Sequence, residues 1–142
     1  MHTEHLQNVR PSWVAFGWFI GAAVFSLLTL AMIAAGILDT EGARPADAFW
    51  LLLAMFLGYM VGGYFTGARV GAAPILHAVG IGLFSVVFWF VVNVAGEPFG
   101  GDAWRSLSPA FFAGVILLQI FSAATGARIG SRAARAATAQ PS

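Results

Sequence analysis

The chain has 142 residues, of which 59% are apolar and 9% are charged, and its formal net charge is +1. Soluble domains carry about 25% charged residues, so this composition excludes an ordinary soluble domain. Cysteine is absent, which excludes disulfides and thiolate chemistry.

Apolar residues dominate four segments that follow one another along the chain. A helix of about 20 residues crosses the roughly 30 Å of bilayer hydrocarbon. A helix of a soluble bundle keeps a polar stripe, but residues 86–92 and 111–118 have none. The sequence therefore predicts an all-α, polytopic membrane protein with four transmembrane helices. The predicted spans are Trp13–Leu38, Phe49–Arg69, Ile75–Ala95 and Ala110–Arg128.

A five-residue pattern occurs twice. Gly67-Ala68-Arg69-Val70-Gly71 recurs 59 residues later as Gly126-Ala127-Arg128-Ile129-Gly130, and each copy ends an apolar segment. This recurrence indicates a duplication. We expect two hairpins, residues 13–71 and 72–130, between a cytoplasmic segment 1–12 and a cytoplasmic tail 131–142 that extends beyond the last helix. Both copies enter the membrane in the same direction, so the repeats are predicted to be parallel.

Arginine is distributed unequally between the two predicted sides. The side that holds both termini has Arg10, Arg69, Arg128, Arg132 and Arg135, whereas the other has only Arg44 and Arg105. Basic residues near helix ends favour the cytoplasm. We therefore expect a multi-pass protein with both termini in the cytoplasm.

Prolines mark the starts of the predicted helices. Pro11, Pro45, Pro74 and Pro109 each lie at or just before an apolar segment, where the missing N–H of proline costs no helix hydrogen bond. Ser108 is a candidate N-cap. Because few residues separate the second segment from the third, these two helices are expected to be antiparallel neighbours.

Small residues recur at four-residue spacing and therefore share one face of each helix. Such faces let backbones approach closely, which joins helices where lipid already solvates apolar groups. We expect the second and fourth helices to contact each other, or their hairpin partners, along these faces, and Gln119 to form an interhelical hydrogen bond there. The predicted packing residues are Gly17, Gly21, Gly58, Gly62, Gly63, Gly67, Gly71, Gln119, Ser122, Gly126 and Gly130.

Arg69 and Arg128 each lie one turn beyond the last deeply apolar residue of a segment. In one interpretation they extend to the headgroup region and set the topology. In the other they form, with Arg132 and Arg135, a basic site for anionic lipid headgroups. The sequence leaves both interpretations open.

His77 is the one ionisable side chain inside the third segment, about one turn from its cytoplasmic end. An ionisable group within a span is by default a functional hypothesis, here proton transfer or ligand contact. At this depth interfacial water is within reach, which favours a plain interfacial role.

The run Gly62-Gly63-Tyr64-Phe65-Thr66-Gly67-Ala68-Arg69, followed by Leu76-His77-Ala78, resembles a pattern in uncharacterised small bacterial four-helix membrane proteins. In those, Gly-Gly-x-x-x-Gly-x-Arg ends helix two and a Leu-His-Gly/Ala step opens helix three. The resemblance implies the four-span architecture and a bacterial inner (cytoplasmic) membrane, and it implies no activity.

The sequence contains no catalytic, cofactor-binding or metal-ligating pattern. We therefore expect a non-enzymatic interaction, accessory or scaffold protein that contacts the lipid bilayer and has no cofactor and no nucleic-acid partner. A homo-oligomer or a larger membrane complex is the candidate assembly. One alternative is a small channel or transporter formed by an oligomer. Another is an enzyme that acts on lipid through Glu97 or Asp102 in an outer loop.

Overall fold

The computed structural model describes residues 9–39, 44–71, 73–96 and 108–139. Within these ranges the chain forms four helices that are long and apolar enough to cross a membrane. The prediction of an all-α protein with four candidate spans is confirmed, and the chain is a small four-helix membrane protein. The helices are α1 (Pro11–Ala34), α2 (Pro45–Val70), α3 (Pro74–Gly96) and α5 (Pro109–Thr138).

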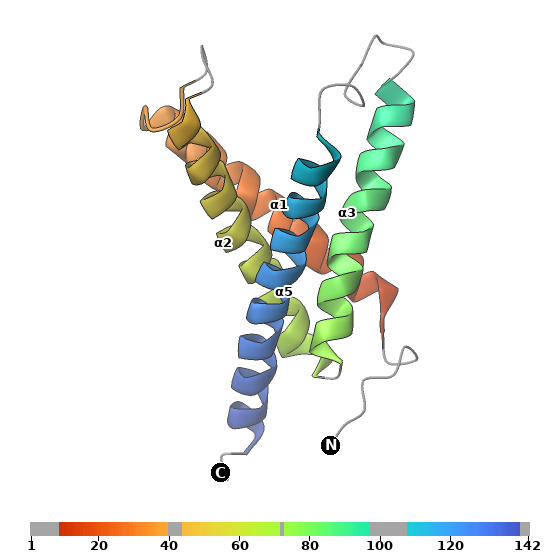
Figure 1. Cartoon of the computed structure of the whole chain (residues 1–142). Coiled ribbons are helices and arrows are strands. Elements are labelled where there is room, and N and C mark those ends of the chain that lie inside the picture. The colour runs from red at the N-terminus through yellow and green to blue at the C-terminus, as the bar shows by residue number, and fades with distance from the viewer. Residues whose placement is uncertain (1–8, 40–43, 72, 97–107, 140–142) are drawn as a thin grey trace.

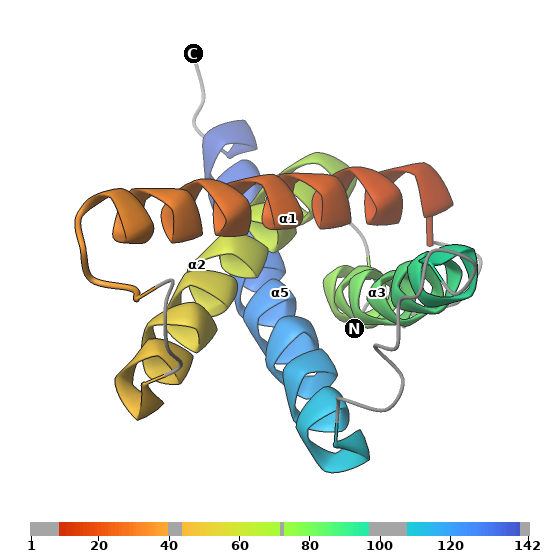
Figure 2. The ribbon, with the colours of Figure 1, turned by 90° about the horizontal axis from the view of Figure 1, so that it is seen from above.

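Successive helices alternate in direction (Figure 1). α1 and α3 begin toward one end of the bundle, and α2 and α5 run toward that same end. We call it the Arg69 end, because Arg69 lies in the last turn of α2 there, and we call the opposite end the Arg44 end. Figure 2 shows that α1 runs across the other helices at a steep angle.

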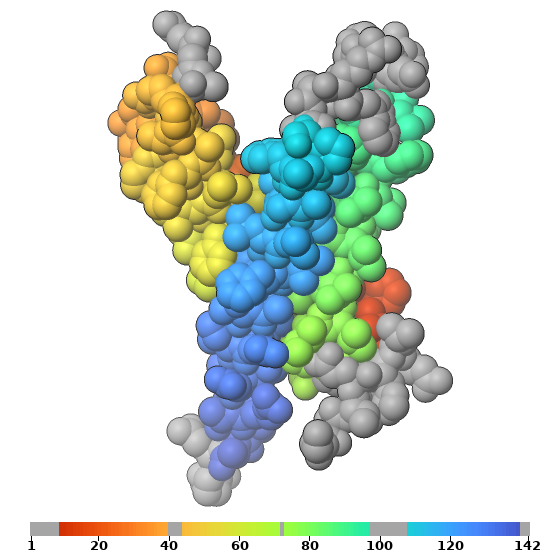
Figure 3. Space-filling view, viewed as in Figure 1, coloured from red at the N-terminus to blue at the C-terminus, as the bar shows by residue number. Residues whose placement is uncertain are grey.

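α2 lies at the centre of the packing. Its most extensive contact is with α5 and its next is with α1, whereas α3 packs mainly against α5 and α1. Figure 3 shows α5 in front, between α2 and α3. The expected neighbours α2 and α3 touch only slightly, because two faces of α2 are already covered by α1 and α5.

Each described helix begins at a proline. At α2, the backbone N–H of Arg44 donates to Asp47 Oδ2 at 3.0 Å, and Arg44 Nη2 donates to Asp47 Oδ1 at 3.0 Å. The same Nη2 donates to the carbonyl oxygen of Ile37 at 2.9 Å, which ties the first turn of α2 to the chain before it. Hydrogen bonding to Asp47 raises the pKa of the Arg44 guanidinium above its ordinary value. Ser108 is the N-cap residue of α5, but its hydroxyl makes no capping hydrogen bond within the described residues.

Two helix ends differ from the sequence prediction. α1 ends at Ala34 rather than at Leu38, and Gly36 follows with a left-handed φ of 68°. α5 continues to Thr138, so most of the expected tail is helical. Alanine is the strongest helix former, and it occupies four positions between Arg132 and Thr138.

Candidate functional site

The contact between α1 and α2 is made by glycines of both helices. A Cβ added to Gly62 would overlap the carbonyl oxygen of Gly17, and one added to Gly58 would lie 2.7 Å from the carbonyl oxygen of Gly21. Gly21 itself lies against the ring of Tyr59, where an added Cβ would be 2.8 Å from Cδ1. Because real Cβ atoms do not approach backbone this closely, no side chain can be accommodated at Gly58 or Gly62.

The contact between α2 and α5 is also built from backbone. A Cβ on Gly63 would overlap the carbonyl group of Ala123, and one on Gly67 would overlap that of Ala127. These pairs advance together along both helices, so α2 and α5 are parallel. Such close approach increases the van der Waals attraction between the two helices.

α5 contributes its own glycines to the same contact. A Cβ on Gly126 would overlap the carbonyl oxygen of Met60, and one on Gly130 would overlap that of Tyr64. Ser122 occupies the equivalent position one turn earlier, and its hydroxyl donates to the carbonyl oxygen of Phe56 on α2. Each helix therefore presses small residues against the backbone of the other.

Gly62 and Gly63 are adjacent in sequence but serve different contacts, since Gly62 faces α1 and Gly63 faces α5. Neighbouring residues of an α-helix, with 3.6 residues per turn, point about 100° apart. The glycine pair thus lets two helices approach the backbone of α2 at the same level. The sequence prediction combined these positions into one wide face, and the structure divides them between two.

Gly71 was predicted as a packing residue, and this prediction is wrong. It is the C-cap of α2, with a left-handed φ of 68°, and its N–H donates to the carbonyl oxygen of Gly67 at 3.2 Å. Among the described residues no atom lies within 4 Å of the place where its Cβ would be. Glycine is favoured here by the helix end.

The structure adds packing residues that the sequence analysis did not name. Gly80 lies against Val14 of α1, and Gly82 lies against Ile120 of α5. The fully buried Thr66 donates its hydroxyl to the carbonyl oxygen of Gly62 at 3.0 Å and lies 3.3 Å from that of Trp13. The pair Gly80 and Gly82, which are separated by one residue, is the sequence signal that could have predicted these two contacts of α3.

His77 is 1% exposed and uses both ring nitrogens. The backbone N–H of Arg10 donates to Nε2 at 3.1 Å, so Nε2 is an acceptor. Nδ1 lies 2.9 Å from the carbonyl oxygen of Ala73 and therefore carries the proton. In this arrangement the neutral imidazole joins the start of α1 to the start of α3.

Gln119 is 7% exposed, and its carboxamide reaches across to α2. Its Nε2 lies 3.8 Å from the sulfur of Met55, to which it donates a weak hydrogen bond. Its Oε1 is buried and has no hydrogen-bond partner among the described residues. An interhelical hydrogen bond was expected for Gln119. In the structure its Nε2 makes such a bond, to α2, and its Oε1 makes none among the described residues.

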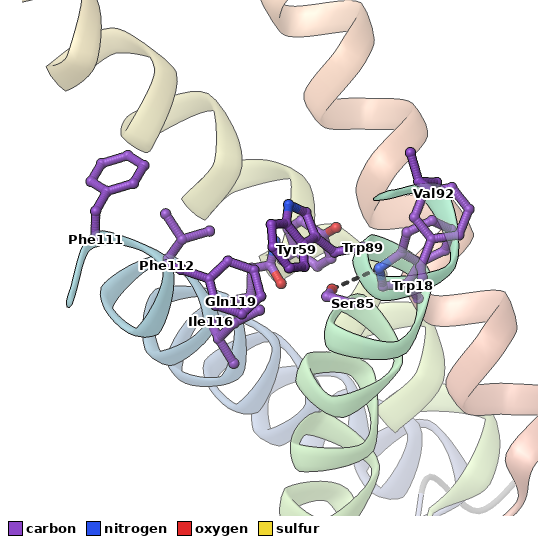
Figure 4. A pocket seen from close by; sticks show the side chains of 11 residues that line it. Trp18, Tyr59, Ser85, Trp89, Val92, Phe111, Phe112, Ile116 and Gln119 are labelled. Carbon is purple, nitrogen blue, oxygen red and sulfur yellow. Dashed lines mark hydrogen bonds between the residues drawn. The ribbon is translucent and has the colours of Figure 1, made fainter. Parts of the chain in front are cut away.

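A cavity of about 270 Å³ lies beside Gln119, between all four helices. We call it the aromatic cavity, because six aromatic side chains line it. Near the helix midpoints it is bordered by Ser85 and Gln119, and Figure 4 shows both pointing toward the same space as Tyr59. From there it extends toward the Arg44 end, where α5 begins. Its aromatic residues are Trp18, Tyr59, Phe88, Trp89, Phe111 and Phe112.

The indole of Trp18 fixes one wall of the aromatic cavity. Its Nε1–H donates to Ser85 Oγ at 2.7 Å, and its ring contacts Phe84 and Phe88 in tilted arrangements with centroid separations of 5.1 and 4.6 Å. On the opposite side Trp89 contacts Phe112, also tilted, with the centroids 4.6 Å apart. Which rings meet around the cavity depends on tertiary structure, because they come from all four helices.

The four arginines considered for lipid headgroups are exposed. Arg69 borders a shallow hollow with Trp13 and Phe16 at the start of α1. Arg135 donates from Nε to the carbonyl oxygen of Ser131 at 3.2 Å, within its own helix. The remaining two are Arg128 and Arg132, which lie on α5.

Metal-ligating clusters were not expected, and within the described residues no group of three or more His, Cys, Asp or Glu side chains could hold a metal ion. Glu97 and Asp102, the alternative acidic residues, and Arg105 lie outside the described residues.

Comparisons with family models, with curated proteins and with solved structures find no match to this chain. No family is identified, and the resemblance noted in the sequence stays a prediction.

Proposed function

We propose that the protein is a non-enzymatic accessory or scaffold protein of a bacterial inner membrane. In this proposal it arose by duplication of one hairpin and has both termini in the cytoplasm. Its four candidate spans support the membrane location, and the bacterial setting rests on the resemblance of residues 62–69 and 76–78 noted in the sequence. Its arginines, five toward one side and two toward the other, support the orientation.

The observation that carries the proposal is the use of the glycine faces. At both the α1–α2 and the α2–α5 contact, Cβ atoms added to the packing glycines of α2 and α5 would meet backbone, which leaves no room for a solvated path at these positions. The buried hydroxyls of Thr66, Ser85 and Ser122 all make hydrogen bonds inside the bundle. Because these hydroxyls are used in hydrogen bonds within the bundle, they support a structural role for the protein and not a catalytic one.

The surface open to a partner is then the outward side of the bundle. The outward side chains of α3 are large, apolar and exposed, with Val87 at 59% and Val91 at 54%. In a membrane such a surface contacts lipid or another transmembrane helix. A homo-oligomer and a larger membrane complex are both assemblies that this surface could support.

Accessibility of single cysteines tests the packing role against the channel or transporter. The chain has no native cysteine. We expect Ser122→Cys, a near-isosteric change at a fully buried site, to resist a membrane-impermeant maleimide. Thr138→Cys, at the exposed end of α5, serves as the reactive control. Reaction of Ser122→Cys at the rate of the control would favour a transport pathway.

Two further labelling positions test the orientation. Thr138→Cys at the Arg69 end is expected to react only in inverted membrane vesicles. Ala46→Cys, exposed in the first turn of α2 at the Arg44 end, is expected to react only in intact spheroplasts. The opposite pattern would overturn the proposed topology.

Photo-crosslinking in living cells tests the accessory role directly. A photoreactive amino acid at Val87, on the exposed face of α3, is expected to give a discrete protein adduct. The matched control is the buried Ile81 on the same helix, which should crosslink only within the chain. Adducts with lipid alone at Val87 would argue against a partner on this face.

A further inference from the structure

Two buried side-chain oxygens have no hydrogen-bond partner among the described residues, Asn93 Oδ1 and Gln119 Oε1, and Gln119 lines the aromatic cavity. Ser85 Oγ accepts from the indole of Trp18 at 2.7 Å and donates to the carbonyl oxygen of Ile81 at 3.3 Å. Gln119 Nε2 donates to the sulfur of Met55. Gln119 Oε1 remains, buried and without a donor among the described residues.

An unbonded carbonyl oxygen at this depth is costly. Leaving a buried acceptor unpaired destabilises a protein appreciably, and the hydrocarbon of a bilayer offers no water to replace the missing donor. Figure 4 shows that the carboxamide of Gln119 faces the cavity on the side of Tyr59 and Ser85. A hydrogen-bond donor placed in the cavity at this position would complete the bonding of Gln119 Oε1.

The rest of the cavity determines the other properties of such a donor. Aromatic rings from all four helices line it, and aromatic walls favour a flat ring in offset or edge-to-face contact. Its volume of about 270 Å³ lies just below the range of drug-sized pockets. It suits a single ring with a small substituent, with any long chain left outside.

The mouth of the cavity opens toward lipid. Phe88 and Phe111 border it and are 47% and 54% exposed on the outer surface of the bundle. Val92 beside them is 51% exposed. A molecule dissolved in the bilayer can therefore enter sideways, between α3 and α5, and keep an alkyl chain in the membrane.

We propose that the aromatic cavity binds a lipid-soluble phenol, whose ring lies among the aromatic side chains and whose O–H donates to Gln119 Oε1. A phenolic hydroxyl is a stronger donor than an aliphatic one, and its ring matches the walls. This binding site is independent of the accessory role proposed above, since it requires neither a partner nor an oligomer.

A matched pair of probes tests the proposal on the full-length protein in phosphatidylcholine nanodiscs. 4-Nonylphenol has the ring, the chain and the donor, whereas its methyl ether, 4-nonylanisole, lacks only the donor. Binding is followed by the change in tryptophan fluorescence, because Trp18 and Trp89 line the cavity. Protein-free nanodiscs correct for partition into lipid.

We expect saturable binding of the phenol, about five- to ten-fold tighter than that of the ether, as one neutral hydrogen bond provides. Gln119→Leu should abolish this preference, and Leu117→Ala, at a 66% exposed position on the same helix, should retain it. Val115→Phe, which fills the cavity from its wall, should weaken both probes and serves as the second variant should Gln119→Leu not fold.

Three results would overturn the proposal. They are the absence of saturable binding of the phenol, equal affinity for the phenol and the ether in the wild-type protein, and a phenol preference that survives in Gln119→Leu. An undiminished affinity for the phenol in Val115→Phe would place binding elsewhere and would also overturn it.

Discussion

α5 packs against its two main neighbours in opposite ways. Toward α2 it presents Gly126 and Gly130, and the two backbones meet without intervening side chains. Toward α3 it presents large side chains, with Phe112 tilted against Trp89 and Ile120 packed over Gly82. The first contact is closed at the glycines themselves, with an apolar hollow of about 180 Å³ beside Gly126, and the second borders the aromatic cavity.

The difference shows how residue size determines both contact and cavity in a membrane bundle. Small residues allow backbones to approach until they exclude everything else. Rigid aromatic rings hold helices apart and rarely fill the gap evenly. One helix can therefore provide a fixed contact on one face and a binding space on another.

The largest expected effect comes from obstructing the α2–α5 contact. Gly126→Leu should cost more than about 3 kcal/mol, because its side chain meets the backbone of Met60 and cannot be accommodated by rotation. Gly114→Leu is the matched control on the same helix, since within the described residues nothing lies within 4 Å of its Cβ position. Thermal unfolding in mild detergent measures both. Equal melting temperatures would contradict the packing described here.

Two glycine-to-alanine variants compare a methyl group that meets backbone with one that meets a side chain. Gly63→Ala should cost about 1–3 kcal/mol, because its methyl group meets the fixed carbonyl group of Ala123. Gly82→Ala should cost less, because its methyl group meets Ile120, whose side chain can change rotamer. Denaturation midpoints in the same detergent rank the two. A larger loss in Gly82→Ala would reverse this interpretation.

His77 tests a third kind of contact, a hydrogen bond between helix ends. His77→Phe should cost about 1–3 kcal/mol, since the buried imidazole loses its bonds to the N–H of Arg10 and to the carbonyl oxygen of Ala73. Trp18→Phe is the comparison, and it should cost less because Ser85 keeps its bond to Ile81. Unfolding of each variant is measured alongside wild type. If His77→Phe were as stable as the wild type, the imidazole would not stabilise the contact between the starts of α1 and α3.

The smallest expected effects compare two polar side chains of α5 that both bond to α2. Ser122→Ala should cost about 0.6 kcal/mol, as hydrogen bonds between membrane helices do on average. Gln119→Leu should be neutral or stabilise by about 1 kcal/mol in the absence of a ligand, because it removes an unpaired buried oxygen. Melting temperatures in ligand-free detergent compare them. A clear loss of stability in Gln119→Leu would show that the unpaired Oε1 does not destabilise the folded protein.

Much of the architecture was predictable because its causes are local. Hydrophobic length predicts the four spans, and proline predicts where each begins, since a residue without an N–H fits the first turn of a helix. Four-residue spacing identifies which glycines share a face. These are properties of a single helix in a bilayer, so they can be predicted without knowing which helix packs against it.

The partner of each face was decided by tertiary structure. Sequence alone could not divide Gly62 from Gly63, nor remove Gly71 from the packing set, because both depend on where other helices lie and where α2 ends. The aromatic cavity is the clearest case. Its lining comes from four helices distant in sequence, and the empty space among them exists only because rings that pack against neighbours on one side cannot also close the gap on the other.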